Sequence, residues 1–122
     1  MEKLIREYFR AWLDADGSRL GDFFEDGAVY SECYGPEYVG LGEISEWFCR
    51  WNARGRVLRW DIKRMINEGN VWAVEWYFSC VYDGTPSAFD GVSLIEFDAD
   101  GKITGLREFE SKAGHYRPYA KK

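Results

Sequence analysis

Residues 70–83, NVWAVEWYFSCVYD, alternate between two kinds of side chain, and no other stretch constrains the fold as strongly. A period of two residues is typical of a β-strand, whose successive side chains point to opposite faces of a sheet. One face of this stretch is mixed, and the other is wholly apolar or aromatic. The apolar face consists of Trp72, Val74, Trp76, Phe78, Cys80 and Tyr82. We therefore expect a long strand inside a sheet, with its aromatic face covered by other elements.

The first part of the chain carries helical patterns that can provide this cover. Apolar side chains fall on one stripe of a predicted helix over residues 2–15 and on one stripe of another over residues 43–51. Between them the sequence predicts a short helix after Ser18, a strand over residues 28–33 and a loop over residues 34–42. The stripe of the later helix is Ile44, Trp47, Phe48 and Trp51.

After the last helix the pattern changes to a period of two and stays so. It predicts strands over residues 57–67, 70–83, 88–97 and 102–111, joined by short turns. Helices followed by antiparallel strands indicate the α+β class, with the helices on one face of the sheet. We expect one domain over residues 1–122, with a frayed tail from about residue 112. The first of these strands should place Leu58, Trp60, Ile62 and Ile66 on its inner face.

Charge and motifs exclude several classes of function. The net charge is -5 without a basic cluster, which argues against nucleic acid or an anionic membrane as a partner. Charges within the first nine residues exclude a signal peptide, so a cytoplasmic location is the expectation. The three cysteines, Cys33, Cys49 and Cys80, lack metal-ligand spacing and indicate reduced thiols. With no nucleotide- or phosphate-binding motif, we expect neither a metal nor a cofactor.

Aromatic residues make up 18% of the chain and include six Trp. Such residues usually fill a core, but they also wall ligand pockets. The sequence leaves both interpretations open.

Three segments carry a resemblance to a known family. They are FFEDGAVYSE at 23–32, the helix after Gly40-Leu41-Gly42, and FDGVSLIEFDADGKITGLREF at 89–109. With the order of elements, they make nearly the whole chain resemble the SnoaL-like branch of the nuclear transport factor 2-like superfamily. The resemblance implies a cone-shaped, curved antiparallel sheet of about four long strands plus a short one. It also implies three helices, an inner pocket and a homodimer.

The steroid isomerases of that superfamily supply candidate site residues. The resemblance puts their oxyanion-hole tyrosine at Tyr8, their general base at Glu32 and their oxyanion-hole aspartate at Ser93. A serine hydroxyl can donate a hydrogen bond but is no carboxylic acid, so steroid isomerase activity is not implied. The implied catalytic set is Glu32, Tyr8 and Ser93. The implied substrate-binding set is Trp12, Tyr30, Trp60, Trp76, Phe78, Glu108 and Glu110.

Four of the candidate residues have an alternative interpretation. Glu32 could be an exposed or ion-paired strand end, and Tyr8 an ordinary core tyrosine. Glu108 and Glu110 face the pocket if the family register holds, and mutual repulsion would then raise the pKa of one of them. Arg64 could neutralise both, or a slip by one residue could turn both outward.

Two classes of function follow. One is a cofactor-independent acid–base enzyme of isomerase, cyclase or dehydratase type that acts on a small apolar or aromatic substrate. The other is a non-catalytic ligand-binding or interaction domain of the same fold. The fold hosts both classes, so it does not decide between them.

Overall fold

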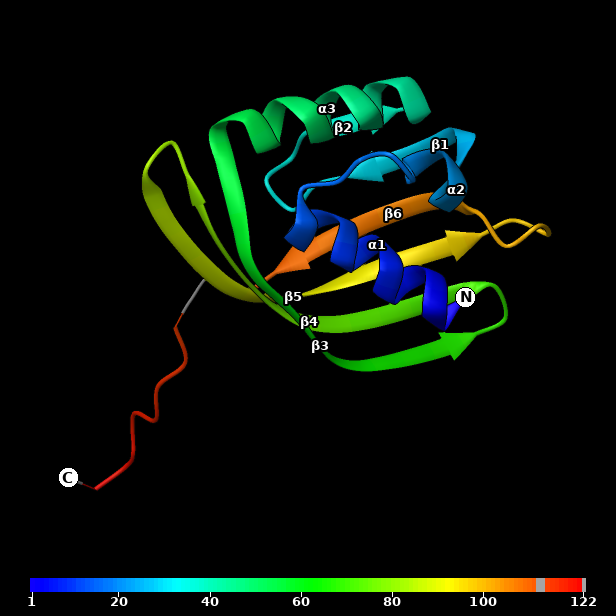
Figure 1. The fold of residues 1–122 in the computed structure, drawn as a ribbon. Helices are drawn as coiled ribbons and strands as arrows, with labels where there is room; N and C mark the ends of the chain where they lie inside the picture. The colour runs from blue at the N-terminus through cyan, green and yellow to red at the C-terminus, as the bar shows by residue number, and fades with distance from the viewer. Residues whose placement is uncertain (112–113, 122) are drawn as a thin grey trace.

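The computed structural model describes residues 1–111 and 114–121, and its elements follow the predicted order with one addition (Figure 1). The additional element is a short strand, β2, in the segment predicted as a loop. The elements are α1 (Glu2–Asp14), α2 (Leu20–Phe23), β1 (Phe24–Ser31), β2 (Glu37–Val39), α3 (Leu41–Arg54), β3 (Gly55–Glu68), β4 (Val71–Tyr82), β5 (Thr85–Phe97) and β6 (Ile103–Glu110).

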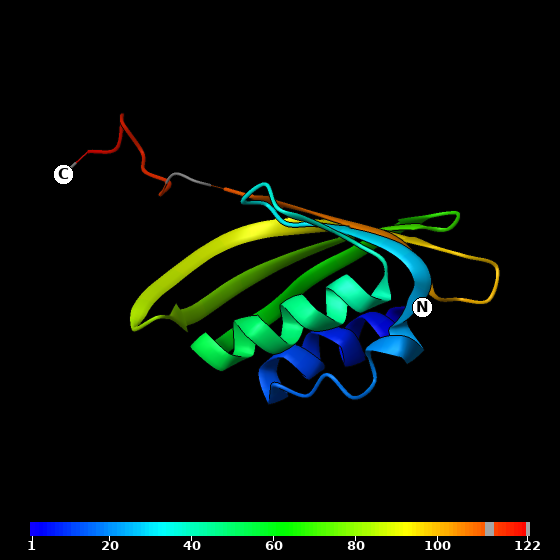
Figure 2. The same cartoon turned by 90° about the horizontal axis from the view of Figure 1, so that it is seen from above.

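The strands form one curved sheet with the order β2-β1-β6-β5-β4-β3. All three helices lie against its concave face (Figure 2). The predicted α+β class with a curved sheet is confirmed, but the sheet is mixed. Strand β1 pairs in parallel with β6, the last strand, and the other pairs are antiparallel.

Strand β1 begins at Phe24, four residues before the predicted start, because Phe24 already pairs with Ile103 of β6. Its other neighbour is β2, where Tyr30 lies opposite Tyr38. Gly40 follows β2 with a φ of 90°, a conformation that favours glycine, and α3 starts directly after it. These short connections bring β1, β2 and α3 together around one end of the concave face.

Strand β3 corrects the predicted inner face of residues 57–67. Leu58 and Ile66 are 51% and 56% exposed. The pairing with β4 shifts between Val57 and Arg59 and again between Ile62 and Arg64. Each such bulge adds a residue to one strand and so reverses the alternation beyond it. Simple alternation therefore misplaces both residues.

The core lies between α1 and the concave face of the sheet. The buried stripe of α1 contains Ile5, Tyr8, Phe9 and Trp12. Phe9 stacks on Trp60 of β3, with ring centroids 3.9 Å apart. This packing covers the part of the concave face that lies beneath α1.

Outside this body, residues 114–121 are exposed and extend away from the sheet (Figure 1). The predicted tail starts at residue 112, so its first two positions and residue 122 lie outside the described residues. Among the helices that are described, none is long and apolar enough to cross a membrane.

Candidate active site

A cavity of about 730 Å³ lies between the concave face of the sheet and helix α3. This volume is within the range typical of small-molecule sites. Its walls are mostly aromatic, so the aromatic residues of this chain do both things that the composition allows: some fill the core and others line a pocket. The aromatic lining residues are Trp12, Tyr30, Tyr34, Tyr38, Trp47, Trp51, Trp60, Trp76, Phe78, Tyr82 and Phe89.

Strand β4 supplies one wall through the alternation seen in the sequence: Trp76, Phe78, Cys80 and Tyr82 all line the cavity. The Trp76 ring passes close to Gly91 of β5: a Cβ atom at position 91 would come within 2.4 Å of the ring. Glycine at position 91 is therefore what allows the indole to lie there.

A chain of hydrogen bonds leads from the core to the floor of the cavity. The Trp12 Nε1–H group donates to the Tyr8 hydroxyl at 2.9 Å, and the Tyr8 hydroxyl donates to that of Tyr30 at 2.9 Å. The Tyr30 hydroxyl then donates to Glu108 Oε2 at 2.5 Å. Each hydroxyl thus donates once and accepts once. The chain fixes Tyr30 and Glu108 in position and directs its last donor at the carboxyl group.

Burial raises the pKa of Glu108 to about 8, although the Tyr30 hydrogen bond acts in the opposite direction. The negative charge of Glu32 raises this pKa further, whereas the backbone N–H of Cys33 lowers it. Glu108 is partly buried and lines the cavity. Near neutral pH its carboxyl group is therefore largely protonated and able to donate.

Glu32 is the second inner carboxyl group of the cavity. Burial raises its pKa, and a hydrogen bond that Oε1 accepts from the Tyr38 hydroxyl at 2.6 Å opposes this. Tyr38 is held in turn by stacking on Trp47, with centroids 4.5 Å apart and ring planes 12° apart. The two carboxyl groups therefore have different surroundings, which is the condition for an acid and a base at the same pH.

The rim of the cavity on α3 carries Glu43, Glu46 and Arg50. Arg50 is the single positively charged residue among the lining residues, and it pairs with Glu46 at 2.8 Å. In the part of the chain that the structure describes, no Lys or Arg comes within 4.0 Å of the Glu32 or Glu108 carboxylates. Both inner carboxyl groups thus lack a cationic partner.

The structure brings most of the predicted site residues together. Glu32 and Glu108 line the cavity, as do the predicted wall residues Trp12, Tyr30, Trp60, Trp76 and Phe78.

Three predicted site residues lie outside the lining. Tyr8 is behind Tyr30. Ser93 is fully buried and accepts a hydrogen bond from Trp76 Nε1 at 2.9 Å, so its hydroxyl is not offered to a ligand. Glu110 lines a separate depression beside His115.

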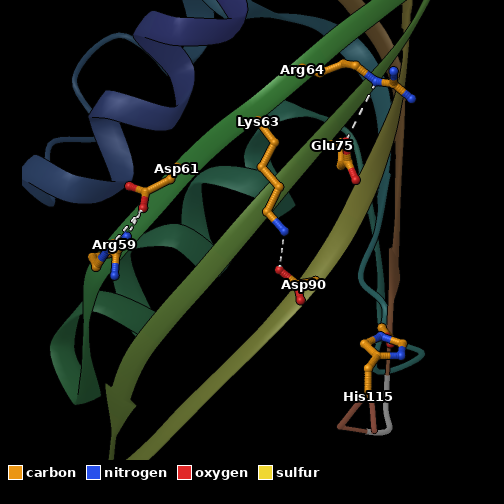
Figure 3. A network of polar contacts seen from close by, with 8 residues as sticks. Arg59, Asp61, Lys63, Arg64, Glu75, Asp90 and His115 are labelled. Atoms are coloured by element: carbon orange, nitrogen blue, oxygen red, sulfur yellow. Dashed lines mark hydrogen bonds and ion pairs between the residues drawn. The ribbon is translucent and has the colours of Figure 1, made fainter. Parts of the chain in front are cut away.

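The alternative that Arg64 neutralises Glu108 does not fit the structure. Arg64 lies 3.8 Å from Glu75 on the opposite, convex face of the sheet (Figure 3). Asp90 is on the same face and pairs with Lys63 at 2.6 Å. His115 is exposed and contacts Ser111. Arg64, Asp90 and His115 are therefore not among the residues that line the cavity.

Several lining residues were not among the predicted site residues. Tyr34 and Tyr38 come from the segment predicted as a loop, and the two aromatic residues four positions apart were the available signal. Trp47 and Trp51 were predicted on the inner stripe of a helix but not as pocket walls. Cys33 and Cys80 also line the cavity, whereas Cys49 is exposed. Across residues 1–111 and 114–121, no group of three or more His, Cys, Asp or Glu side chains could hold a metal ion.

Comparisons with solved structures show the same fold at low sequence identity. A Catenulispora acidiphila protein with a ketosteroid isomerase-like fold, in complex with trimethylamine, matches with a TM-score of 0.75 and 22% identity over 89% of this chain and 85% of that chain. An LEH-like epoxide hydrolase of M. tuberculosis matches with a TM-score of 0.80 and 18% identity over 89% and 76%. A candidate SnoaL-like polyketide cyclase of Shewanella denitrificans matches with a TM-score of 0.77 and 19% identity over 90% and 89%.

A search of curated proteins gives no significant match. The sequence model of the SnoaL-like domain family, in contrast, matches residues 5–106, which is most of the chain. The curved sheet, the three helices on its concave face and the inner cavity agree with this match. The chain therefore belongs to the SnoaL-like domain family.

Proposed function

We propose that this protein binds a small, largely apolar or aromatic molecule in its cavity and transfers a proton on it without a cofactor. The observation that carries the proposal is the pair of carboxyl groups, Glu32 and Glu108, in one aromatic cavity with different surroundings. Perturbed carboxyl groups in a cleft are typical of acid–base sites.

In this proposal Glu32 is the base, because it is partly desolvated and its pKa is raised towards neutral. Glu108 is the acid, because it holds its proton near neutral pH and can donate to an oxygen that gains charge. Once Glu108 has released its proton, the Tyr30 hydroxyl and the Cys33 N–H stabilise its carboxylate. Tyr8 acts only through Tyr30, as a positioning residue.

The names of proteins with the same fold are consistent with reactions on small organic molecules. They include an epoxide hydrolase and a candidate polyketide cyclase, and another relative holds trimethylamine, a small organic molecule. Sequence identities near 20% show only that the fold is shared. The proposed reaction therefore rests on the residues of the cavity.

The test is exchange of carbon-bound hydrogen for deuterium in β-tetralone, an aromatic ketone with acidic C–H groups. Proton NMR in D₂O follows the exchange catalysed by wild-type protein and by three variants. We expect Glu32→Gln to abolish the enzymatic exchange, Glu108→Gln to slow it, and Glu75→Gln on the convex face to leave it unchanged. Circular dichroism controls for folding. Equal rates for wild type and Glu32→Gln would contradict the proposal.

A second candidate function is ligand binding without catalysis. It is favoured by the hydrogen bonds that Tyr30 and Tyr38 already make to the two carboxyl groups, since these leave fewer acceptor sites free. Perturbation of the Trp47 and Trp60 indole N–H signals by β-tetralone, with no exchange by wild-type protein, would select this function.

We also propose a homodimer that packs through the convex face. The half-buried apolar residues there would cover one another in such a dimer, which explains apolar side chains on an otherwise charged face. Sedimentation equilibrium tests this, and a monomer at micromolar concentration would contradict it. The residues concerned are Tyr77, Val81, Val92 and Leu94.

A further inference from the structure

We infer that the molecule bound in this cavity is an organic cation, an amine or quaternary ammonium group carried on a small apolar body. This inference rests on the proposed function in that it names the class of ligand for the same site. Two features of the cavity support it: the arrangement of its rings, and the negative balance of its charges, which includes the two inner carboxyl groups.

The rings form a corner rather than a stack. Trp60 lies nearly perpendicular to Trp76, with centroids 5.8 Å apart and an interplanar angle of 84°, and to Phe78, at 5.6 Å and 81°. Phe89 adds a further tilted ring, 5.3 Å from Phe78. Ring faces carry negative electrostatic potential, so the ring surfaces that remain open to the cavity attract a cation.

The protein does not fill this corner with a cation of its own. Arg side chains lie over the rings of Phe23, Tyr77, Tyr82 and Phe109. Of these four rings only Tyr82 lines the cavity, and its Arg54 is an exposed residue paired with Asp83. For the inner rings of the described structure, such as Trp60 and Trp76, no cation–π partner is found.

The charged side chains of the lining also favour a cationic ligand. Four Glu and a single Arg line the cavity, and Arg50 is already paired with Glu46. Glu32 and Glu108 lie inside with tyrosine hydroxyls as their side-chain partners. An anionic ligand would be repelled here, and a neutral one would leave the ionised form of either carboxyl group without a counter-charge. A cation supplies that counter-charge and contacts the rings at the same time.

The experiment compares two probes of the same shape, choline and its carbon analogue neohexyl alcohol. Their binding to wild-type protein is measured at pH 9, where Glu108 is largely ionised, through the indole N–H signals of Trp47 and Trp60. We expect choline to bind about tenfold or more tightly than the alcohol. Glu108→Gln should remove most of this preference by weakening choline alone.

Two matched variants separate the causes. Phe78→Leu keeps apolar bulk but removes a ring, so it should weaken choline several-fold more than the alcohol. Glu75→Gln removes one negative charge from the convex face and should change neither affinity. An equal loss of choline binding in Glu75→Gln would show a non-specific effect of net charge and would overturn the inference.

The other possible outcomes separate the inferred ligand class from the proposed function. If the alcohol binds as tightly as choline, or choline does not bind, the inference falls, whereas the proposed function stands as long as β-tetralone exchange depends on Glu32. If choline is preferred and no exchange occurs, the inference stands and the catalytic part of the proposed function falls.

Discussion

Carboxyl groups on the two faces of the sheet have different kinds of partner. On the convex face, each of Asp61, Glu75 and Asp90 has an Arg or Lys beside it (Figure 3). On the concave face, Glu32 and Glu108 have only hydrogen-bond donors without charge. These three exposed carboxylates have a cationic neighbour, whereas the two partly buried carboxyl groups of the cavity have none.

This contrast is the reverse of what stability alone would produce. A buried carboxyl group without a counter-charge opposes folding when it is ionised, whereas an exposed ion pair contributes little in either direction. An arrangement that lowers stability inside a cavity is typical of a functional site. The following predictions test the contrast between the two faces.

The largest effect is expected from neighbouring aromatic residues on opposite faces of β4. Trp76→Ala should lower the free energy of unfolding by about 3–5 kcal/mol, because it opens a large cavity beside buried side chains. Tyr77→Ala on the convex face should lower it by about 1–2 kcal/mol, since Tyr77 is only half-buried. Urea unfolding of both variants measures the difference. Equal losses would contradict the assignment of the two faces.

The second effect is the pH dependence of stability that Glu108 produces. Its pKa rises from 4.5 to about 8 on folding, so between these values the folded protein keeps a proton that the unfolded chain has released. This stabilisation is complete below pH 4.5 and is lost as the pH rises through about 8. The loss should amount to on the order of 2–4 kcal/mol. Tyr30, Glu32 and Cys33 also face this group and modify its titration.

Urea unfolding of wild-type protein and Glu108→Gln between pH 5 and pH 9 measures this loss. Because the variant has no proton to release at position 108, its stability should fall less over this range. Parallel curves for the two proteins would show that Glu108 titrates like an exposed carboxyl group.

A smaller effect is expected where two adjacent hydroxyl groups of β1 face opposite sides. Tyr30→Phe should cost about 1–3 kcal/mol, because it leaves the buried Tyr8 hydroxyl without its acceptor and Glu108 without its donor. Ser31→Ala removes an exposed hydrogen bond to Glu37 and should change stability by about 0.5 kcal/mol or less. Thermal unfolding of the two variants side by side gives the comparison. A loss for Ser31→Ala as large as for Tyr30→Phe would mean that burial does not decide the value of these bonds.

The smallest effect is expected on the convex face itself. Asp90→Asn breaks the pair with Lys63, in which both side chains are nearly half exposed, at 46% and 43%. Solvent and salt screen such a pair, so the unfolding midpoint should hardly change and should converge with that of wild type as salt is added. A difference that persists at high salt would show that solvent does not screen this pair and that the two faces differ less than their exposure indicates.

The alternation of residues 70–83 carried most of the predictable information. It identified the lining residues of β4 without knowledge of the partner strands. This is possible because successive side chains of a strand point to opposite faces of the sheet, and here only one face is covered by helices. The same reasoning failed for Leu58 and Ile66, because a bulge depends on the pairing with the next strand and leaves no mark in the sequence of one strand.

The candidate site was predictable only in part, for a similar reason. Trp76 and Phe78 lie on a periodic element, so their direction followed from the pattern. The partner of Glu108 is Tyr30, on a strand 78 residues earlier, and only the parallel pairing of β1 with β6 brings them together. Ser93 was placed by resemblance, and what it contacts depends on the indole that crosses Gly91.

The parallel pairing of β1 with β6 also sets an order of assembly. Strand β1 has β2 as its only local partner, and its second neighbour is the last strand of the sheet. Contacts that close so long a loop form late and slowly, whereas the β3–β4–β5 hairpins need only local turns. On the ribosome, the Tyr30–Glu108 hydrogen bond cannot form before β6 has left the exit tunnel. A nascent chain that ends before Ile103 therefore contains the aromatic residues of the lining but not Glu108, so the hydrogen-bond chain to the floor of the cavity is completed only after β6 has been made.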